Sequence, residues 1–89
     1  MKYKIFFHKN LKKDLRDLDR KIISRFFDIV SNKIAVNPGS GRRLKGKYKD
    51  FWRYRVGNYR IIYQFKNKNV RILILRFKHR KNVYDDLFY

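Results

Sequence analysis

Arginine side chains recur on three predicted strands in the second half of the chain, among aromatic and aliphatic residues. They are Arg53, Arg55, Arg60, Arg71, Arg76 and Arg80, all within residues 51–84. A guanidinium stays charged at physiological pH and can bind two phosphate oxygens at once. Its repetition on neighbouring strands therefore indicates a ligand dense in phosphate, and RNA is the ligand that we favour.

RNA carries its own nucleophile, because its 2′-hydroxyl can attack the adjacent phosphorus once a base removes the proton. Cleavage then needs a group that stabilises the charge developing on the phosphate. Arg60 is the candidate for holding the scissile phosphate, and Arg53 and Arg55 are candidates for assisting it. The alternative is that Arg53 and Arg55 belong to a solvated face.

Three further side chains are candidates for proton transfer and base positioning. The imidazole is the side chain best suited to proton transfer near neutral pH, so His79 is the better candidate for the general base. Arg80 either orients phosphate or donates a proton toward the leaving oxygen. Tyr84 can stack on or position a splayed base. The choice of base and acid stays open, since His79 also suits a structural role and Tyr84 also suits a packed C-terminal aromatic.

A basic segment precedes these strands, where residues 39–50 hold three of the four glycines. Its cations are Arg42, Arg43, Lys45, Lys47 and Lys49. We expect them to contact RNA or to dock on a highly charged target, and a solvated charge run is the alternative.

The composition narrows the class of protein. Lys plus Arg is 25 and Asp plus Glu is 7, which gives a net charge of +18 and requires an anionic partner. The 44% hydrophobic and 18% aromatic content argues against a disordered basic tail. The absence of cysteine excludes disulfides, thiolate metal sites and cysteine nucleophiles, and Asp85 and Asp86 are too isolated to hold a metal. We therefore expect neither a metal nor a cofactor.

Residues 1–89 have the length of a single domain. The apolar run near the start is too brief for a signal peptide, and no stretch approaches the ~20 apolar residues of a membrane helix. We expect a cytoplasmic protein without membrane contact.

The hydrophobic pattern predicts a strand over residues 3–7, followed by two helices. The first helix begins after Asn10 as its cap, and the second begins after Asp19 and ends at Asn37–Gly39. The apolar stripe of the first helix is Leu11, Leu15, Leu18 and Ile22, and that of the second is Ile22, Ile23, Phe26, Phe27, Val30 and Ile34.

Three strands follow, from Phe51 to Val56, Tyr59 to Phe65 and Val70 to Phe77, with turns at Gly57-Asn58 and around Asn67. This order predicts an α+β fold: an N-terminal strand, a two-helix hairpin and a three-stranded antiparallel meander, with both helices packed on one face of the sheet. Alternation turns the aromatic residues toward the helices. The open face then carries Arg53, Arg55 and Arg60 together.

With these residues placed, the chain resembles the RelE/ParE superfamily of toxins over nearly its whole length. The similar pieces are Arg43-Leu44-Lys45-Gly46, the run from Trp52 to Tyr63, and His79-Arg80 followed by Val83-Tyr84. The resemblance implies the RelE-like microbial RNase fold and a ribosome-dependent, metal-independent endoribonuclease, or mRNA interferase, that cuts mRNA in the A site and inhibits translation. It also implies a toxin–antitoxin hetero-oligomer with a cognate RelB-like antitoxin.

The functional positions of the family fall on Arg53, Arg55, Arg60, Arg80 and Tyr84. The chain departs from the pattern on the second predicted strand, where Lys is expected and Arg stands. Two alternatives follow: a ParE-like inhibitor of DNA gyrase without nuclease activity, and a non-enzymatic RNA-binding protein.

Overall fold

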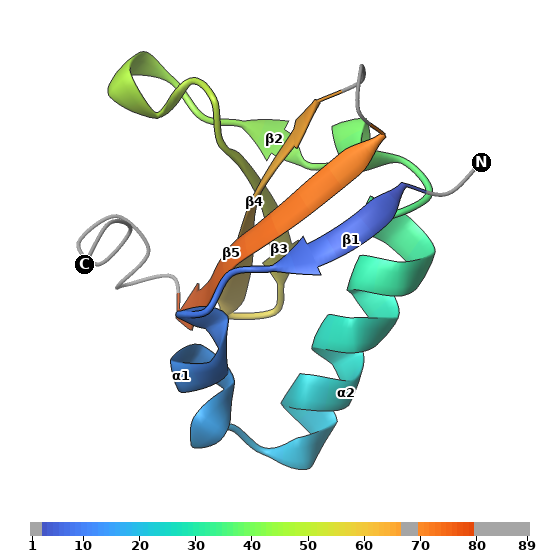
Figure 1. The fold of residues 1–89 in the computed structure, drawn as a ribbon. Coiled ribbons are helices and arrows are strands. Elements are labelled where there is room, and N and C mark those ends of the chain that lie inside the picture. The colour runs from blue at the N-terminus through green and yellow to red at the C-terminus, as the bar shows by residue number, and fades with distance from the viewer. Residues whose placement is uncertain (1–2, 67–69, 80–89) are drawn as a thin grey trace.

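A mixed five-stranded sheet forms the centre of the structure, a computed structural model that describes residues 3–66 and 70–79 (Figure 1). Its strands are β1 (Lys4–Phe7), β2 (Arg42–Arg43), β3 (Trp52–Val56), β4 (Tyr59–Lys66) and β5 (Arg71–His79). They lie in the order β1-β5-β4-β3-β2, with β1 parallel to β5 and every other pair antiparallel. The predicted α+β class and meander are confirmed, and β2 is an edge strand where the sequence predicted a loop.

Two α-helices connect β1 to β2 in the described part of the chain, α1 (Leu11–Arg16) and α2 (Arg20–Ile29). The α2 helix continues as a π-helical turn, Val30–Ile34, and short 3-10 turns follow at Pro38–Ser40 and Gly46–Tyr48. Asp19 caps α2 as predicted, because its Oδ1 accepts the backbone N–H of Lys21 at 3.1 Å.

The predicted cap of α1 is wrong. Asn10 has a helical backbone and its side chain makes no capping hydrogen bond. His8 accepts the backbone N–H groups at the start of the helix instead. Its carbonyl oxygen accepts the N–H of Leu11 at 3.0 Å, and its Nδ1 accepts the N–H of Asn10 at 3.1 Å. The short segment of residues 8–10 therefore leads from β1 into α1.

Both helices cover the same face of the sheet, and the main core lies between these layers (Figure 1). Its buried residues are Leu11, Phe26, Val30, Ile34, Val56, Ile61, Tyr63, Ile72, Ile74 and Phe77. Phe27 differs from its prediction: it lies at the margin of the α2 stripe, 43% exposed, with its ring edge-on to Phe7. The aromatic face of β3 and β4 is turned to the helices as predicted.

A β-bulge interrupts the pairing of β4 with β5. Ile62 is opposite Arg76 but the next residue, Tyr63, is opposite Ile74, so Leu75 is the extra residue. The alternation of β5 is therefore inverted after Leu75. Beyond the bulge Phe77 faces the helices, and Arg76 points to the other face.

The start of β5 also differs from the prediction. Val70 is not part of the strand, because its backbone has the left-handed value φ 51. This conformation is unfavourable for a β-branched side chain. The predicted turn around Asn67 lies outside the described residues.

Candidate nucleic-acid interface

The β3–β4 hairpin positions the predicted arginines. Gly57 adopts φ +60 at the turn, a conformation that glycine takes without strain, and the tight turn sets Arg55 directly opposite Arg60. Val56 and Ile61 are buried against the helices. The period of two therefore places Arg53, Arg55 and Arg60 together on the face away from the helices, as predicted.

The strand register aligns cations in rows across this face. Arg55 on β3 is opposite Arg60 on β4, which is opposite Lys78 on β5. A second pair joins Arg42 on β2 to Arg53 on β3. We call these five residues the basic face. Like charges directly opposite in a sheet repel each other, so the arrangement favours an anionic ligand across the strands.

Three of these arginines line a shallow pocket at the edge of the sheet. Its volume is about 530 Å³, and it is lined by Ser40, Gly41, Arg42, Arg53, Tyr54 and Arg55. The short β2 pairs with Trp52 and Arg53 alone among the described residues, so the pocket lies beside β3 at the point where β2 begins. Backbone and guanidinium groups thus border one concave surface.

A buried tyrosine lies next to Gly41, one of the residues that line this pocket. Tyr63 is fully buried, and its hydroxyl donates to the carbonyl oxygen of Pro38 at 2.6 Å. Burial raises the pKa of Tyr63 to about 12, so the phenol keeps its proton at neutral pH. A Cβ at Gly41 would overlap both the Tyr63 hydroxyl and the carbonyl oxygen of Arg53, so this position requires glycine.

The chain that follows β2, residues 44–51, packs on the face of the sheet away from the helices. Ile62 is fully buried there in a second apolar cluster with Tyr48, Phe51 and Leu75. The Leu44 N–H donates to the Phe51 carbonyl at 2.9 Å and closes the loop. This packing had no clear signal in the sequence, because it requires Ile62 and Leu75 to be neighbours on adjacent strands.

The cations of this segment lie at the surface of the loop. Lys45, Lys47 and Lys49 are exposed, and the Lys47 ammonium lies 5.2 Å from the centre of the Tyr48 ring. Arg43 is exposed as well, and its Nε donates to the carbonyl oxygen of Lys49 at 2.7 Å. The loop therefore presents a charged rim beside the face that carries Arg42.

His79 lies on the other side of the sheet from Arg60. It is opposite Tyr59 in the register, and the two rings meet edge to face at 5.5 Å between their centres. Tyr59 packs against the main core, so the histidine is turned toward the helix side. The bulge at Leu75 causes this placement. Arg80 and Tyr84 lie outside the described residues.

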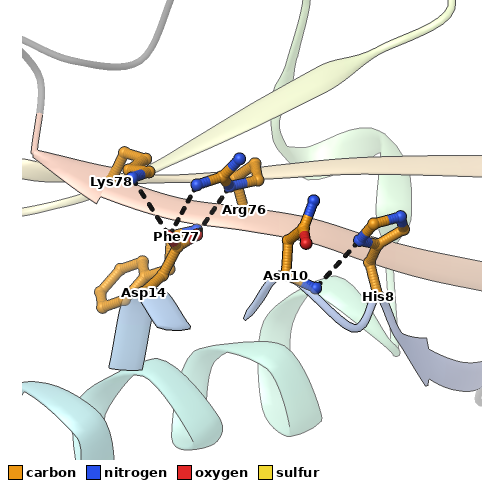
Figure 2. A network of polar contacts seen from close by, with 6 residues as sticks. All are labelled: His8, Asn10, Asp14, Arg76, Phe77 and Lys78. Atoms are coloured by element: carbon orange, nitrogen blue, oxygen red, sulfur yellow. Dashed lines mark hydrogen bonds and ion pairs between the residues drawn. The ribbon is translucent and has the colours of Figure 1, made fainter. Parts of the chain in front are cut away.

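Arg76 and Arg71 do not join the basic face. Arg76 is 5% exposed, and Asp14 on α1 binds it through two contacts, Nη2 to Oδ1 at 2.8 Å and Nε to Oδ2 at 2.9 Å (Figure 2). Arg71 lies at the opposite end of β5, with its guanidinium 5.5 Å from the centre of the Phe6 ring. Arg76 is therefore buried in an ion pair within the protein, whereas Arg71 is exposed at the end of β5 away from the basic face.

Lys78 is the member of the basic face that the sequence analysis missed. Asp14 Oδ1 lies 3.2 Å from its ammonium, and Asp14 Oδ2 accepts the backbone N–H of Phe77 at 3.0 Å (Figure 2). Burial alone would raise the pKa of Asp14, but the hydrogen bonds of Arg76 and Phe77 outweigh it, and the pKa lies below its ordinary value of 3.8. Asp14 is thus an anion at neutral pH.

Two other kinds of feature are absent from the described ranges, 3–66 and 70–79. No helix there has the length and apolar character to cross a membrane. The same residues contain no group of three His, Cys, Asp or Glu side chains arranged to hold a metal ion.

Comparison with known proteins gives concordant matches. The family model of the ParE toxin of type II toxin–antitoxin systems matches residues 5–84. The chain is similar to the RelB–RelE antitoxin–toxin complex from Methanococcus jannaschii, with 32% identity, a TM-score of 0.71 and coverage of 91% of this chain and 96% of that chain. It is also similar to the RelE–RelB complex from Pyrococcus horikoshii OT3, with 31% identity, a TM-score of 0.67 and coverage of 90% and 97%.

Another solved structure has lower sequence identity to this chain but higher structural similarity. The RelBE2 toxin–antitoxin complex from Mycobacterium tuberculosis matches with a TM-score of 0.84 at 23% identity, covering 90% of this chain and 93% of that chain. A comparison with curated protein sequences found no match. The mixed sheet with its helix pair on one face thus has the RelE-like fold.

The matched length identifies the family. The chain belongs to the RelE/ParE superfamily, and it is a toxin of a type II toxin–antitoxin system. The resemblance carried by the sequence motifs is confirmed.

Proposed function

We propose that this toxin is a ribosome-dependent endoribonuclease that cuts mRNA in the A site and so inhibits translation. The observation that carries the proposal is the row of Arg55, Arg60 and Lys78 across three strands. An RNA backbone would supply the phosphates that relieve the repulsion within this row.

The proposed reaction uses the nucleophile of the RNA. The 2′-hydroxyl oxygen forms a bond to the adjacent phosphorus as its proton leaves, and the bond from phosphorus to the 5′-oxygen breaks. The 5′-oxygen takes a proton, which leaves a 2′,3′-cyclic phosphate and a new 5′-hydroxyl. Arg60 lies centrally in the row and would stabilise the charge on the phosphate oxygens, with Arg53 and Arg55 assisting. No cofactor enters this scheme.

The proton-transfer roles remain predictions. His79, Arg80 and Tyr84 are the candidates, and His79 would have to act from the end of β5 because its ring contacts Tyr59 on the helix side. The exposed cations Lys45, Lys47 and Lys49 would contact ribosomal or messenger RNA around the cleavage site.

The test is cleavage of ribosome-bound mRNA, mapped by primer extension, for the parent and for Arg60→Ala. Removing one preorganised group that stabilises transition-state charge should lower the cleavage rate by about 10²–10³-fold. Arg25→Ala is the matched control, because it removes the same charge from an exposed position on α2. Cutting by Arg60→Ala at the rate of the control would refute the role of Arg60.

A second candidate function is inhibition of DNA gyrase, which the match to the ParE toxin model favours. In that case the induced toxin would produce DNA breaks and no new RNA ends. A non-enzymatic RNA-binding protein would retain RNA but create no 5′-hydroxyl ends. Primer extension beside a DNA-break assay separates these functions from mRNA cleavage.

The partner that we propose is a cognate RelB-like antitoxin, forming a hetero-oligomer with the toxin in the cytoplasm. The relatives from Methanococcus jannaschii and Pyrococcus horikoshii are in complexes with RelB. With a net charge of +18 on the toxin, an acidic antitoxin segment would cover the basic face. Affinity should fall steeply as salt is raised, and a salt-independent affinity would exclude electrostatic neutralisation.

A further inference from the structure

An aromatic side chain lies on the same face of the sheet as the predicted arginines. Tyr48 is the last residue of the 3-10 turn Gly46–Tyr48, and it packs with Phe51 and Leu75 against Ile62. Ile62 is fully buried, whereas Tyr48 is half-buried, so part of the tyrosine remains in contact with solvent. The RNA-cleaving function proposed above gives no role to this ring.

Hydrogen bonds hold the chain on both sides of Tyr48. The Leu44 N–H donates to the Phe51 carbonyl at 2.9 Å, and the Phe51 N–H donates to the Tyr48 carbonyl at 2.9 Å. The Arg43 Nε donates to the carbonyl oxygen of Lys49 at 2.7 Å. The rings of Tyr48 and Phe51 meet edge to face, with 6.5 Å between their centres. A ring held in this way loses little conformational freedom when a ligand stacks on it.

The strand register places this ring beside two of the predicted phosphate-binding arginines. Ile62, against which Tyr48 packs, is directly opposite Arg53 on β3. On β4 it is two residues from Arg60, about 7 Å along the strand, and the alternation of the strand puts both on one face. One nucleotide of an extended RNA spans a similar distance. A base next to a phosphate bound by Arg60 can therefore reach the Tyr48 ring.

A cation lies over the ring in the structure. The ammonium of Lys47 is 5.2 Å from the centre of the Tyr48 ring, and Lys47 is exposed. The face of the ring is thus within reach of a group from the solvent side. Bases of single-stranded RNA stack on aromatic faces of this kind, and a base that replaces the ammonium releases it to meet a neighbouring phosphate.

We propose that Tyr48 is a base-stacking residue, whose ring binds the nucleobase next to the phosphate held by Arg53 and Arg60. The proposal deepens the RNA-cleaving function proposed above and rests on it. The arginines bind a backbone that is the same at every nucleotide, whereas a stacked base fixes the position of one nucleotide on the sheet. Tyr48 thus determines which phosphate of the RNA lies at Arg60.

The competing explanation is that Tyr48 only covers Ile62. Tyr48→Leu separates the two, because leucine keeps an apolar cover but has no ring, and Tyr48→Phe keeps the ring. The measurement is the Kd for a short 2′-O-methyl oligoribonucleotide, which cannot be cut, by fluorescence anisotropy. We expect the Kd to rise about tenfold for Tyr48→Leu and to stay within about twofold of the parent for Tyr48→Phe. Equal Kd values for Tyr48→Leu and the parent would overturn the proposal.

An oligomer without bases identifies the part of the RNA that the ring contacts. It has the same length and the same 2′-O-methyl backbone, so its phosphates still meet the arginines but nothing stacks on Tyr48. The parent and Tyr48→Leu should therefore bind the abasic oligomer with equal Kd values. A tenfold loss for Tyr48→Leu with both oligomers would overturn the proposal, because the ring would then act on the backbone or on the fold.

Tyr3→Leu is the matched control. Tyr3 is also half-buried, but it packs against the main core between the sheet and the helices. We expect its Kd for the intact oligomer to stay within about twofold of the parent. A loss equal to that of Tyr48→Leu would overturn the proposal, since a general loosening of the packing would explain both.

An NMR measurement on the parent separates failure of this proposal from failure of the proposed function. The Tyr48 ring-proton signals should shift upfield when the intact oligomer binds but not when the abasic oligomer binds, because a stacked base shields them. Unshifted signals, or no binding of the intact oligomer, would overturn the proposal even if Tyr48→Leu does not fold. Absence of cleavage of ribosome-bound mRNA, with the shifts present, would refute the nuclease function instead.

Discussion

The cation row predicts that one arginine of the basic face lowers the stability of the unbound toxin. Arg55 is exposed and lies directly opposite Arg60. Two unit charges about 7 Å apart in water repel each other by about 0.6 kcal/mol. Arg55→Gln should therefore raise the free energy of unfolding by about 0.5 kcal/mol at ~0.01 M salt, where screening is weak. For a domain of this size the melting temperature would rise by about 2–4 °C.

The assay is thermal unfolding, followed by circular dichroism at low and at high salt. At ~1 M salt the screening length is about 3 Å, so the gain should nearly vanish. Arg25→Gln is the control with the opposite sign, because Asp28 lies one helical turn away and removal of Arg25 loses an attraction. A lower melting temperature for Arg55→Gln at low salt, or a gain that persists at ~1 M salt, would refute the reasoning.

Three further changes test other parts of the structure. Tyr63→Phe should lower the free energy of unfolding by about 1–3 kcal/mol in urea titrations, because the buried Pro38 carbonyl loses its donor; an unchanged midpoint would show that this bond adds no stability. Asp14 has a folded pKa below 3.8, so its contribution to stability is present above that pH and is lost as the pH falls through the folded pKa. In Asp14→Asn, the free energy of unfolding should therefore decrease less than in the parent as the pH falls below about 4. The same decrease in both proteins would exclude Asp14 as its source. Val70→Asn should raise the free energy of unfolding by about 1 kcal/mol, since Asn tolerates the left-handed backbone of φ 51 better than Val; a lower midpoint in urea would mean that side-chain packing outweighs the strain.

Local patterns in the sequence predicted much of the fold. Asp19 before an apolar stripe marked the start of α2, and Gly57-Asn58 marked the β3–β4 turn. Both signals depend on neighbouring residues in the chain. The alternation of Trp52 to Val56 then gave the correct face for Arg53 and Arg55.

Pairing between distant segments was beyond this kind of reasoning. The alternation of β5 counted from Ile72 would turn Lys78 toward the helices and His79 toward the arginines. The extra residue at Leu75 exchanges these two faces. A bulge depends on the partner strand, so the sequence of β5 alone gave no signal for it, and the Asp14 contact with Lys78 was missed for the same reason.

The place of β5 in the sheet has a consequence for synthesis of the protein. This strand lies between β1 and β4, yet it follows the other four strands of the described residues in the sequence. β1 can therefore pair only after residues 71–74 have been synthesised, and such long-range pairing is slow to form. A nascent chain that stops before residue 71 lacks the strand that joins β1 to β4, so the sheet stays incomplete until translation has passed this point.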